Sequence, residues 1–228
     1  MPDKLQNVLD LGTGTGLWAI DFADEHPEAQ VLGTDLSPIQ PSSVPPNCAF
    51  EVDDANEEWT YSRKFDYIHV RLHHVSIKED HLYAMSLKFL IPGGWLEHQE
   101  LSFPCGCDDG TLSEDSALYK WSQLMLEGST KFGQPLDNSS KYGDWMKKAG
   151  FENVNHTVFK FPGNDWPKGK QLKNRGLWMM QNHLDGLHGF TMGLFTRALG
   201  WSPEEVEVFL VDVRKDITNR KIHVWWPV

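Results

Sequence analysis

The order of hydrophobic and polar positions predicts alternating buried strands and helices in the first hundred residues. An apolar run at 8–11 is interrupted by three glycines at alternate positions, and a helical pattern then extends from Leu17 to about Glu25. A further helix is expected at 82–90. Four other short apolar runs are expected to be strands: 29–35, 48–52, 65–71 and 95–100. Short buried strands separated by helices predict a doubly wound parallel sheet.

Helical spacing dominates the second half of the chain. An amphipathic helix is expected around 118–125, and another at 139–149, where Gly150 ends it and a sixth strand begins at 151–154. Within 169–200, one apolar stripe is expected to face the core; its members are Leu177, Met180, Leu184 and Leu187. The capping box at Ser202 opens a helix that runs to about residue 219, and a last strand is expected at 222–228.

The stretch Asp10-Leu11-Gly12-Thr13-Gly14-Thr15-Gly16 is read as a strand, a tight turn and the start of a helix. Glycine permits a sharp turn and lets a ligand lie against the main chain. The dinucleotide pattern G-x-G-x-x-G/A fits only from Gly14 to Ala19, and it leaves Asp10 and Gly12 unexplained. The pattern D-x-G-x-G-x-G is filled completely, and it resembles motif I of the class I S-adenosylmethionine (SAM) methyltransferases.

The resemblance implies a cofactor site around this turn, with S-adenosyl-L-homocysteine as the product. The methionyl carboxylate of SAM is expected near the N–H groups of Thr13, Gly14 and Gly16 at the helix start, and its ammonium near Asp10. Arg71 is a second candidate for the carboxylate, and it could instead stabilise the loop.

The remaining candidates for the cofactor site follow the second and third strands. Asp35 lies 19 residues beyond Gly16 at a strand end, the spacing at which a carboxylate binds ribose hydroxyls. Leu36 follows it directly. An acid after the third strand is expected to meet the adenine amino group, with Asp54 favoured; either acid could instead cap the next turn. The candidates at this position are Asp53, Asp54 and Ala55.

Composition narrows the function classes. The formal net charge is −11 at pH 7, so a general electrostatic attraction to nucleic acid or to anionic lipid is not expected. The sequence has no apolar run long enough for a membrane span, we expect no signal peptide, and its three cysteines are not expected to form a disulfide framework. A reducing compartment, the cytoplasm, is expected. Cys105-Gly106-Cys107 is more consistent with ordinary loop thiols than with a metal site, and no metal is expected.

Beyond motif I, the whole chain resembles the fungal LaeA-like methyltransferases. The residues that carry this likeness are Leu36-Ser37-Pro38-Ile39-Gln40-Pro41, Val44-Pro45-Pro46-Asn47 and Phe65-Asp66-Tyr67-Ile68-His69-Val70-Arg71. The resemblance implies a Rossmann-like fold with a mostly parallel seven-stranded sheet of order 3-2-1-4-5-7-6, helices on both faces and a helical insertion before the last strand. We expect one domain, 1–228, with cap insertions at about 103–138 and 164–200. Relative to the family pattern the chain looks trimmed at both ends.

The resemblance also implies two functions. Some family members methylate small molecules in fungal secondary metabolism, whereas others are regulators that associate with velvet-domain proteins and reach the nucleus. O-methylation of a small acceptor is the favoured prediction. A hydroxyl acceptor needs a general base, for which His74 and then His73, just beyond the fourth strand, are the candidates. Plant small-molecule O-methyltransferases carry a histidine near this position, but paired loop histidines are more often structural.

Overall fold

The structure is a computed structural model that describes residues 5–73 and 76–228, and it divides the chain into two units. Unit 1 comprises Met1–Glu100 and Gly143–Val154, and unit 2 comprises Leu101–Tyr142 and Asn155–Val228. Both predicted insertions, 103–138 and 164–200, fall entirely within unit 2. Among the residues described, no helix is long and apolar enough to cross a membrane.

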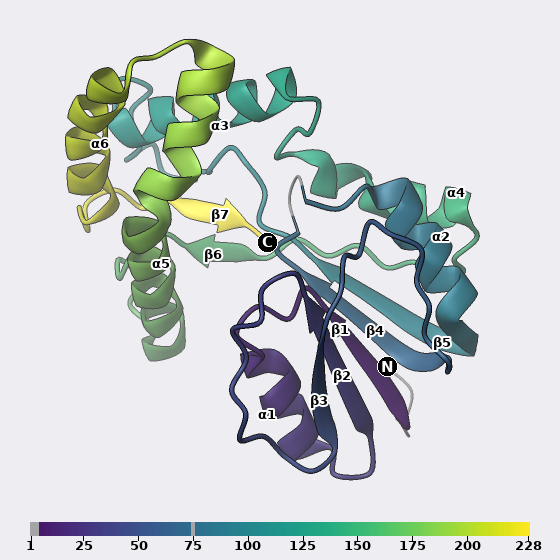
Figure 1. The fold of residues 1–228 in the computed structure, drawn as a ribbon. Helices are drawn as coiled ribbons and strands as arrows, with labels where there is room; N and C mark the ends of the chain where they lie inside the picture. Colours follow the sequence, from purple (N-terminus) through teal and green to yellow (C-terminus); the bar gives the residue numbers. More distant parts are fainter. Residues whose placement is uncertain (1–4, 74–75) are drawn as a thin grey trace. The chain divides into compact units, whose positions relative to one another are not determined.

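A parallel five-stranded sheet of order β3-β2-β1-β4-β5 is the centre of unit 1 (Figure 1). Its elements in chain order are β1 (Asn7–Leu11), α1 (Leu17–Glu25), β2 (Gln30–Asp35), β3 (Cys48–Val52), β4 (Phe65–Arg71), α2 (Glu79–Phe89) and β5 (Leu90–Gln99). The strand order reverses between β1 and β4, the position where parallel α/β sheets bind ligands at the carboxyl ends of their strands. The predicted doubly wound arrangement is confirmed.

Helices bury both faces of the three central strands β2, β1 and β4, as their apolar runs predicted, whereas the edge strands β3 and β5 are largely exposed. On one face, Phe22 and Ala23 of α1 pack with Val8 and Val31 of the strands. On the other face, Leu9 and other strand residues pack with α2 and with α4 (Tyr142–Ala149), which belongs to unit 1 apart from its first residue. Because both faces of the central strands are covered, their carboxyl ends are left as the place for ligand binding.

Unit 2 is built mainly of helices around an aromatic core. Its helices are α3 (Ala117–Lys131), η1 (Asn138–Lys141), α5 (Lys170–Leu194), η2 (Phe195–Leu199) and α6 (Pro203–Ile217). Trp121 and Phe195 are fully buried, and the indole N–H of Trp121 donates to the Thr191 hydroxyl at 2.8 Å, which joins α3 to α5. The predicted capping box at the start of α6 is present, with reciprocal hydrogen bonds between Ser202 and Glu205.

The prediction of one seven-stranded sheet is corrected. β6 (Lys160–Pro162) and β7 (Trp225–Pro227) form a separate antiparallel pair in unit 2. Each is three residues long and ends in proline, which has no N–H to donate to a further strand. Residues 151–154, predicted as the sixth strand, form none, because Asn153 has a φ of 53° and an extended strand requires a negative φ.

The predicted apolar stripe on α5 is partly wrong. Leu187 is fully buried, Met180 and Leu184 are half-buried, but Leu177 is 41% exposed. Instead Gly176 is buried, and a side chain there would come within 1.9 Å of the Asn164 carbonyl oxygen. The buried face of α5 is therefore set by the close approach of its backbone at Gly176, which the hydrophobic pattern does not reveal.

Candidate functional site

The turn after β1 has the conformation that its glycines permit. Gly12, Gly14 and Gly16 have φ values of 70°, 58° and 81°, which L side chains rarely adopt. The Gly16 N–H donates to the Thr13 carbonyl at 2.9 Å, and the Thr13 N–H donates to the carbonyl of Thr34 on β2 at 2.9 Å. The turn is thus fixed against the neighbouring strand and leads directly into α1.

The space beside each glycine identifies where a ligand can approach the main chain. A Cβ at Gly12 would lie 1.7 Å from the His73 ring, and at Gly16 or Gly33 it would meet the Phe50 ring. A Cβ at Gly14 would have no other atom within 4 Å. Because only Gly14 of these four glycines borders open space, it is the point where a ligand can lie against the backbone.

Asp35 and the loop after it meet the glycine turn at Gly14. The Asp35 carboxylate accepts from the N–H of Gly14 at 2.8 Å and from that of Ser37 at 2.9 Å. The Gln40 amide donates to the carbonyls of Gly14 at 2.6 Å and Ser37 at 2.9 Å. The structure thus brings the two predicted cofactor residues Asp35 and Gly14 together, and their contact with the cofactor stays a prediction. Gln40 was missed, although it lies in the segment that carries the family likeness.

Asp10 is buried behind the turn. Its carboxylate accepts from the Thr13 hydroxyl at 2.6 Å and lies 2.7 Å from His69 Nδ1, and Trp18 stacks on the His69 ring at 3.8 Å between centroids. Both carboxylate oxygens therefore have partners that hold the turn in shape. Contact of Asp10 with the cofactor ammonium stays a prediction. His69 was missed, and its position within the apolar run of β4 was the available signal.

The acids after β3 lie beside Asp35. The Asp53 N–H donates to the Asp35 carbonyl at 3.1 Å, and the Asp53 carboxylate accepts from the Asp54 N–H at 3.0 Å. The Asp54 carboxylate accepts from the Asn56 N–H at 2.9 Å, the capping contact considered as an alternative for it. The Ala55 carbonyl accepts from the Trp59 indole at 3.1 Å. Their role toward adenine stays a prediction, as does that of Leu36, whose side chain is 64% exposed.

The candidate bases and Arg71 follow at the end of β4. His74 lies outside the described residues. His73 lies with its Nε2 2.9 Å from the Leu11 carbonyl oxygen and its Nδ1 3.2 Å from the Ser76 hydroxyl. Burial lowers the pKa of His73, although the Leu11 carbonyl and nearby carboxylates oppose the shift. Arg71 is exposed at the strand end. A base role for either histidine stays a prediction.

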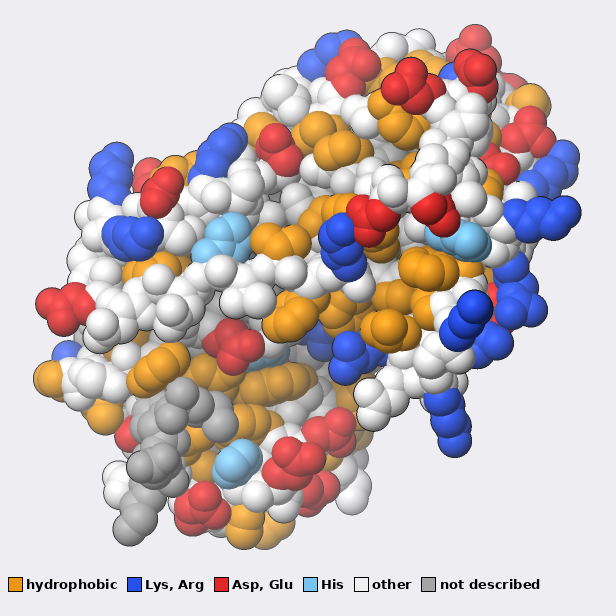
Figure 2. Space-filling view, turned by 180° about the vertical axis from the view of Figure 1, so that it is seen from behind, with side chains coloured by type: hydrophobic (Ala, Val, Ile, Leu, Met, Phe, Trp, Pro, Cys, Tyr) orange, Lys and Arg blue, Asp and Glu red, His pale blue; other side chains and the backbone are white. Residues whose placement is uncertain are grey.

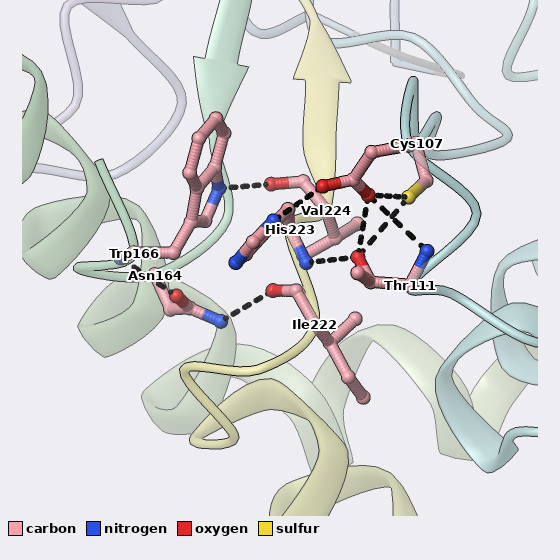
Figure 3. A network of polar contacts seen from close by, with 8 residues as sticks. Cys107, Thr111, Asn164, Trp166, Ile222, His223 and Val224 are labelled. Atoms are coloured by element: carbon pink, nitrogen blue, oxygen red, sulfur yellow. Dashed lines mark hydrogen bonds and ion pairs between the residues drawn. The ribbon is translucent and has the colours of Figure 1, made fainter. Parts of the chain in front are cut away.

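A second polar cluster lies in unit 2, as Figure 3 shows. Asp109 accepts from the hydroxyl of Thr111 at 2.8 Å and the thiol of Cys107 at 3.2 Å, and it lies 2.5 Å from His223 Nδ1. Trp166 stacks on the His223 ring. Within the described residues, no three His, Cys, Asp or Glu side chains are placed to hold a metal ion. The contacts of His223 with Thr111 and Asp109 join a loop to the segment before β7.

The parallel sheet, the glycine turn at its switch point and an acid at the tip of β2 define a Rossmann-like fold that binds a nucleoside cofactor. Comparison with known proteins agrees. Residues 2–156 match the family model described as "Methyltransferase domain", and the chain belongs to this family. Of the two ligand classes considered for the glycine turn, a dinucleotide and SAM, the family match selects SAM. The open space at Gly14 and the acid at Asp35 fit a cofactor that carries a ribose.

Fungal relatives match nearly the entire chain. The chain is 40% identical over 228 residues to the "Probable methyltransferase tdiE" of Emericella nidulans, covering all of this chain and 72% of that protein. It is 36% identical to the "Secondary metabolism regulator LAE1" of Cochliobolus heterostrophus, covering 98% of this chain and 75% of the relative. The chain is therefore a LaeA-like fungal SAM-dependent methyltransferase.

Solved structures share the fold at low identity. Phosphoethanolamine N-methyltransferase 2 of Haemonchus contortus, solved with S-adenosylhomocysteine, matches 99% of this chain and 48% of its own with a TM-score of 0.51 and 22% identity. The [4+2]-cyclase SpnF matches 99% of this chain and 73% of its own, with a TM-score of 0.56 and 17% identity. The second is called a cyclase, so the fold alone does not define the reaction.

Proposed function

We propose that this protein transfers a methyl group from SAM to an oxygen atom of a small fungal secondary metabolite. Support comes from the 40% identity to relatives named methyltransferases, over at least 95% of this chain. The net charge of −11 disfavours nucleic acid as the acceptor.

The observation that carries the proposal is the hydrogen bond between Asp35 and Gly14, because Gly14 borders open space that a cofactor could occupy. Asp35 ends β2 and Gly14 lies in the turn after β1, 21 positions away, yet a 2.8 Å hydrogen bond joins them at the carboxyl edge of the sheet. The bound cofactor supplies a methyl group on a sulfonium, which an acceptor attacks in line. Asp35 would exchange the Gly14 N–H for ribose hydroxyls, and Gln40 would keep the turn in place. Positioning of this kind supplies much of the rate of such a displacement.

Cofactor binding is tested by calorimetry with S-adenosylhomocysteine. We expect Asp35→Ala to raise the Kd at least about tenfold, since it removes hydrogen bonds to a charged group, and Gly14→Arg to abolish binding because its side chain fills the open space. Asp24→Ala, an exposed acid on α1, is the matched control and should leave the Kd unchanged. Unchanged affinity in the first two variants would defeat the assignment of this site.

The acceptor is tested separately. Incubation with SAM carrying a deuterated methyl group and a panel of phenols, alcohols, carboxylic acids, amines and indoles should yield a product heavier by one labelled methyl. Fragmentation should place that label on oxygen. Labelling of nitrogen or carbon alone would reject O-methylation while leaving methyl transfer intact.

A second candidate function is regulation through a protein partner. It is favoured by the likeness to proteins named secondary metabolism regulators and by exposed apolar side chains in unit 2, such as Trp178 and Phe190 of α5 and Val208 of α6. Apolar side chains also reach the surface in several places on the face drawn in Figure 2. Co-purification with a velvet-domain protein, without methyl transfer to any small acceptor, would favour this function.

A further inference from the structure

His73 packs directly against the first glycine of the cofactor turn. Its Nε2 lies 2.9 Å from the carbonyl oxygen of Leu11, the last residue of β1, and its ring fills the space in which a Cβ on Gly12 would lie. A carbonyl oxygen only accepts hydrogen bonds, so His73 Nε2 must carry the proton. This contact joins the segment after β4 to the start of the turn.

The tautomer leaves Nδ1 as the ring nitrogen that could accept a proton from an acceptor molecule. Nδ1 lies 3.2 Å from the Ser76 hydroxyl, within its own loop. Both nitrogens therefore face groups of unit 1. A general base needs a lone pair directed at the reacting hydroxyl. The geometry of His73 is that of a side chain that holds other groups in place.

The backbone before His73 is forced into an unusual conformation. Leu72 has a φ of 56°, and among the described residues only it and Asn153 are non-glycine residues with positive φ. The N–H of Leu72 donates to the Gln99 carbonyl at 3.0 Å, and that of His73 to the buried Glu100 carboxylate at 2.9 Å. Strain of this kind persists where the surroundings enforce it, and it is concentrated at functional sites.

The direction of the pKa shift of His73 agrees with this geometry. Burial lowers the pKa of His73, while the carboxylates of Glu100, Asp35 and Asp10 oppose the shift. A neutral imidazole with its proton on Nε2 can donate to Leu11, and it places no positive charge beside a cationic cofactor.

We propose that His73 is a positioning residue of the cofactor site, which holds the Leu11 carbonyl and fills the space over Gly12 so that the cofactor approaches the turn at Gly14. This assignment requires SAM as the cofactor but does not depend on the identity of the methyl acceptor.

The first test measures the Kd of S-adenosylhomocysteine by calorimetry. His73→Ala should raise it about fivefold to tenfold, the effect of losing one hydrogen bond and its packing, and His73→Gln should recover most of the affinity because its amide can still donate. His156→Ala, an exposed histidine of unit 2, is the control and should bind like the wild type. An unchanged Kd in His73→Ala, or no recovery in His73→Gln, would overturn the proposal.

A double-mutant cycle tests the contact itself. Gly12→Ala should weaken binding in the wild type through its φ of 70° and through the clash with His73. In the His73→Ala background the clash is absent, so the loss of affinity should be at least threefold smaller. Gly110→Ala, which has a φ of 75° and open space, is the matched control and should not change the Kd. Additive effects of Gly12→Ala and His73→Ala would contradict the proposed contact.

A third measurement uses the wild-type protein without cofactor, so its outcome does not depend on the folding of a variant. Long-range proton–nitrogen NMR of the wild type at pH 7.5 should show His73 as the neutral tautomer with its proton on Nε2. A proton on Nδ1, or a charged ring, would reject the assignment.

Discussion

At the scale of single residues, the stability of unit 1 is expected to depend strongly on the buried pair of Asp10 and His69. Both side chains are almost fully buried, and the carboxylate oxygen and the ring nitrogen are 2.7 Å apart. Removing one member of such a pair leaves the other buried without its partner, which commonly costs 3–5 kcal/mol. The shape of the glycine turn therefore depends on a residue of β4 that lies 59 positions away in the chain.

We predict that His69→Phe lowers the free energy of unfolding by about 3 kcal/mol, although phenylalanine can still stack on Trp18. Urea unfolding followed by circular dichroism measures the difference. Asp10→Asn should cost less, because its amide oxygen can still accept from His69. A loss below about 0.5 kcal/mol in His69→Phe would show that the pair does not stabilise unit 1.

The three cysteines should differ sharply in reactivity. Cys48 and Cys105 are buried, and burial raises the pKa of Cys105 to about 11, whereas Cys107 is half-buried. The thiolate is the reactive form, so iodoacetamide at pH 8 should alkylate Cys107 first. Peptide mass spectrometry over time measures the order. Equal labelling in urea is the control, and faster labelling of Cys105 in the folded protein would contradict its burial.

At the scale of elements, side-chain hydrogen bonds of Asp109 and Thr111 help to join their loop to the segment before β7. The His223 N–H donates to the Thr111 hydroxyl at 2.8 Å, and the Asp109 carboxylate pairs with the His223 ring (Figure 3). The hydrogen bond from His223, followed by those from Thr111 and Cys107, lowers the pKa of Asp109. Since the folded-state pKa is depressed, the charged form stabilises the fold.

We therefore predict a pH-dependent effect of Asp109→Asn. The wild type should be more stable than the variant at pH 7 and pH 5, where the carboxylate is ionised in both the folded and the unfolded state. Its advantage should shrink as the pH falls below about 4, the ordinary pKa of an aspartate in the unfolded chain. Thermal unfolding at several pH values measures this, and an advantage that grows toward low pH would reverse the sign and reject it.

At the scale of the whole molecule, the candidate cofactor residues all lie in unit 1, and the predicted helical insertions lie entirely in unit 2. A ligand that binds only the folded state stabilises it by RT ln(1 + [L]/Kd), which is about 2.7 kcal/mol at one hundred times the Kd.

We predict that S-adenosylhomocysteine at this concentration slows amide hydrogen exchange most strongly at residues 12–16 and 35–40 of unit 1. Exchange followed by mass spectrometry measures the effect, and Gly14→Arg is the control that should show none. Protection absent from both segments would place the cofactor elsewhere.

The sequence alone determined the parallel sheet and the chemistry of the glycine turn. Strand periodicity and turn glycines are local signals, so β1 to β4, α1, Gly14 and Asp35 could be predicted from short stretches. The tertiary structure decided the rest. It paired β6 with β7 in a separate sheet and placed Gly176 on the buried face of α5. It also surrounded the glycine turn with His69, His73 and Gln40. These outcomes depend on packing and hydrogen bonds between residues far apart in the chain, which local patterns do not specify.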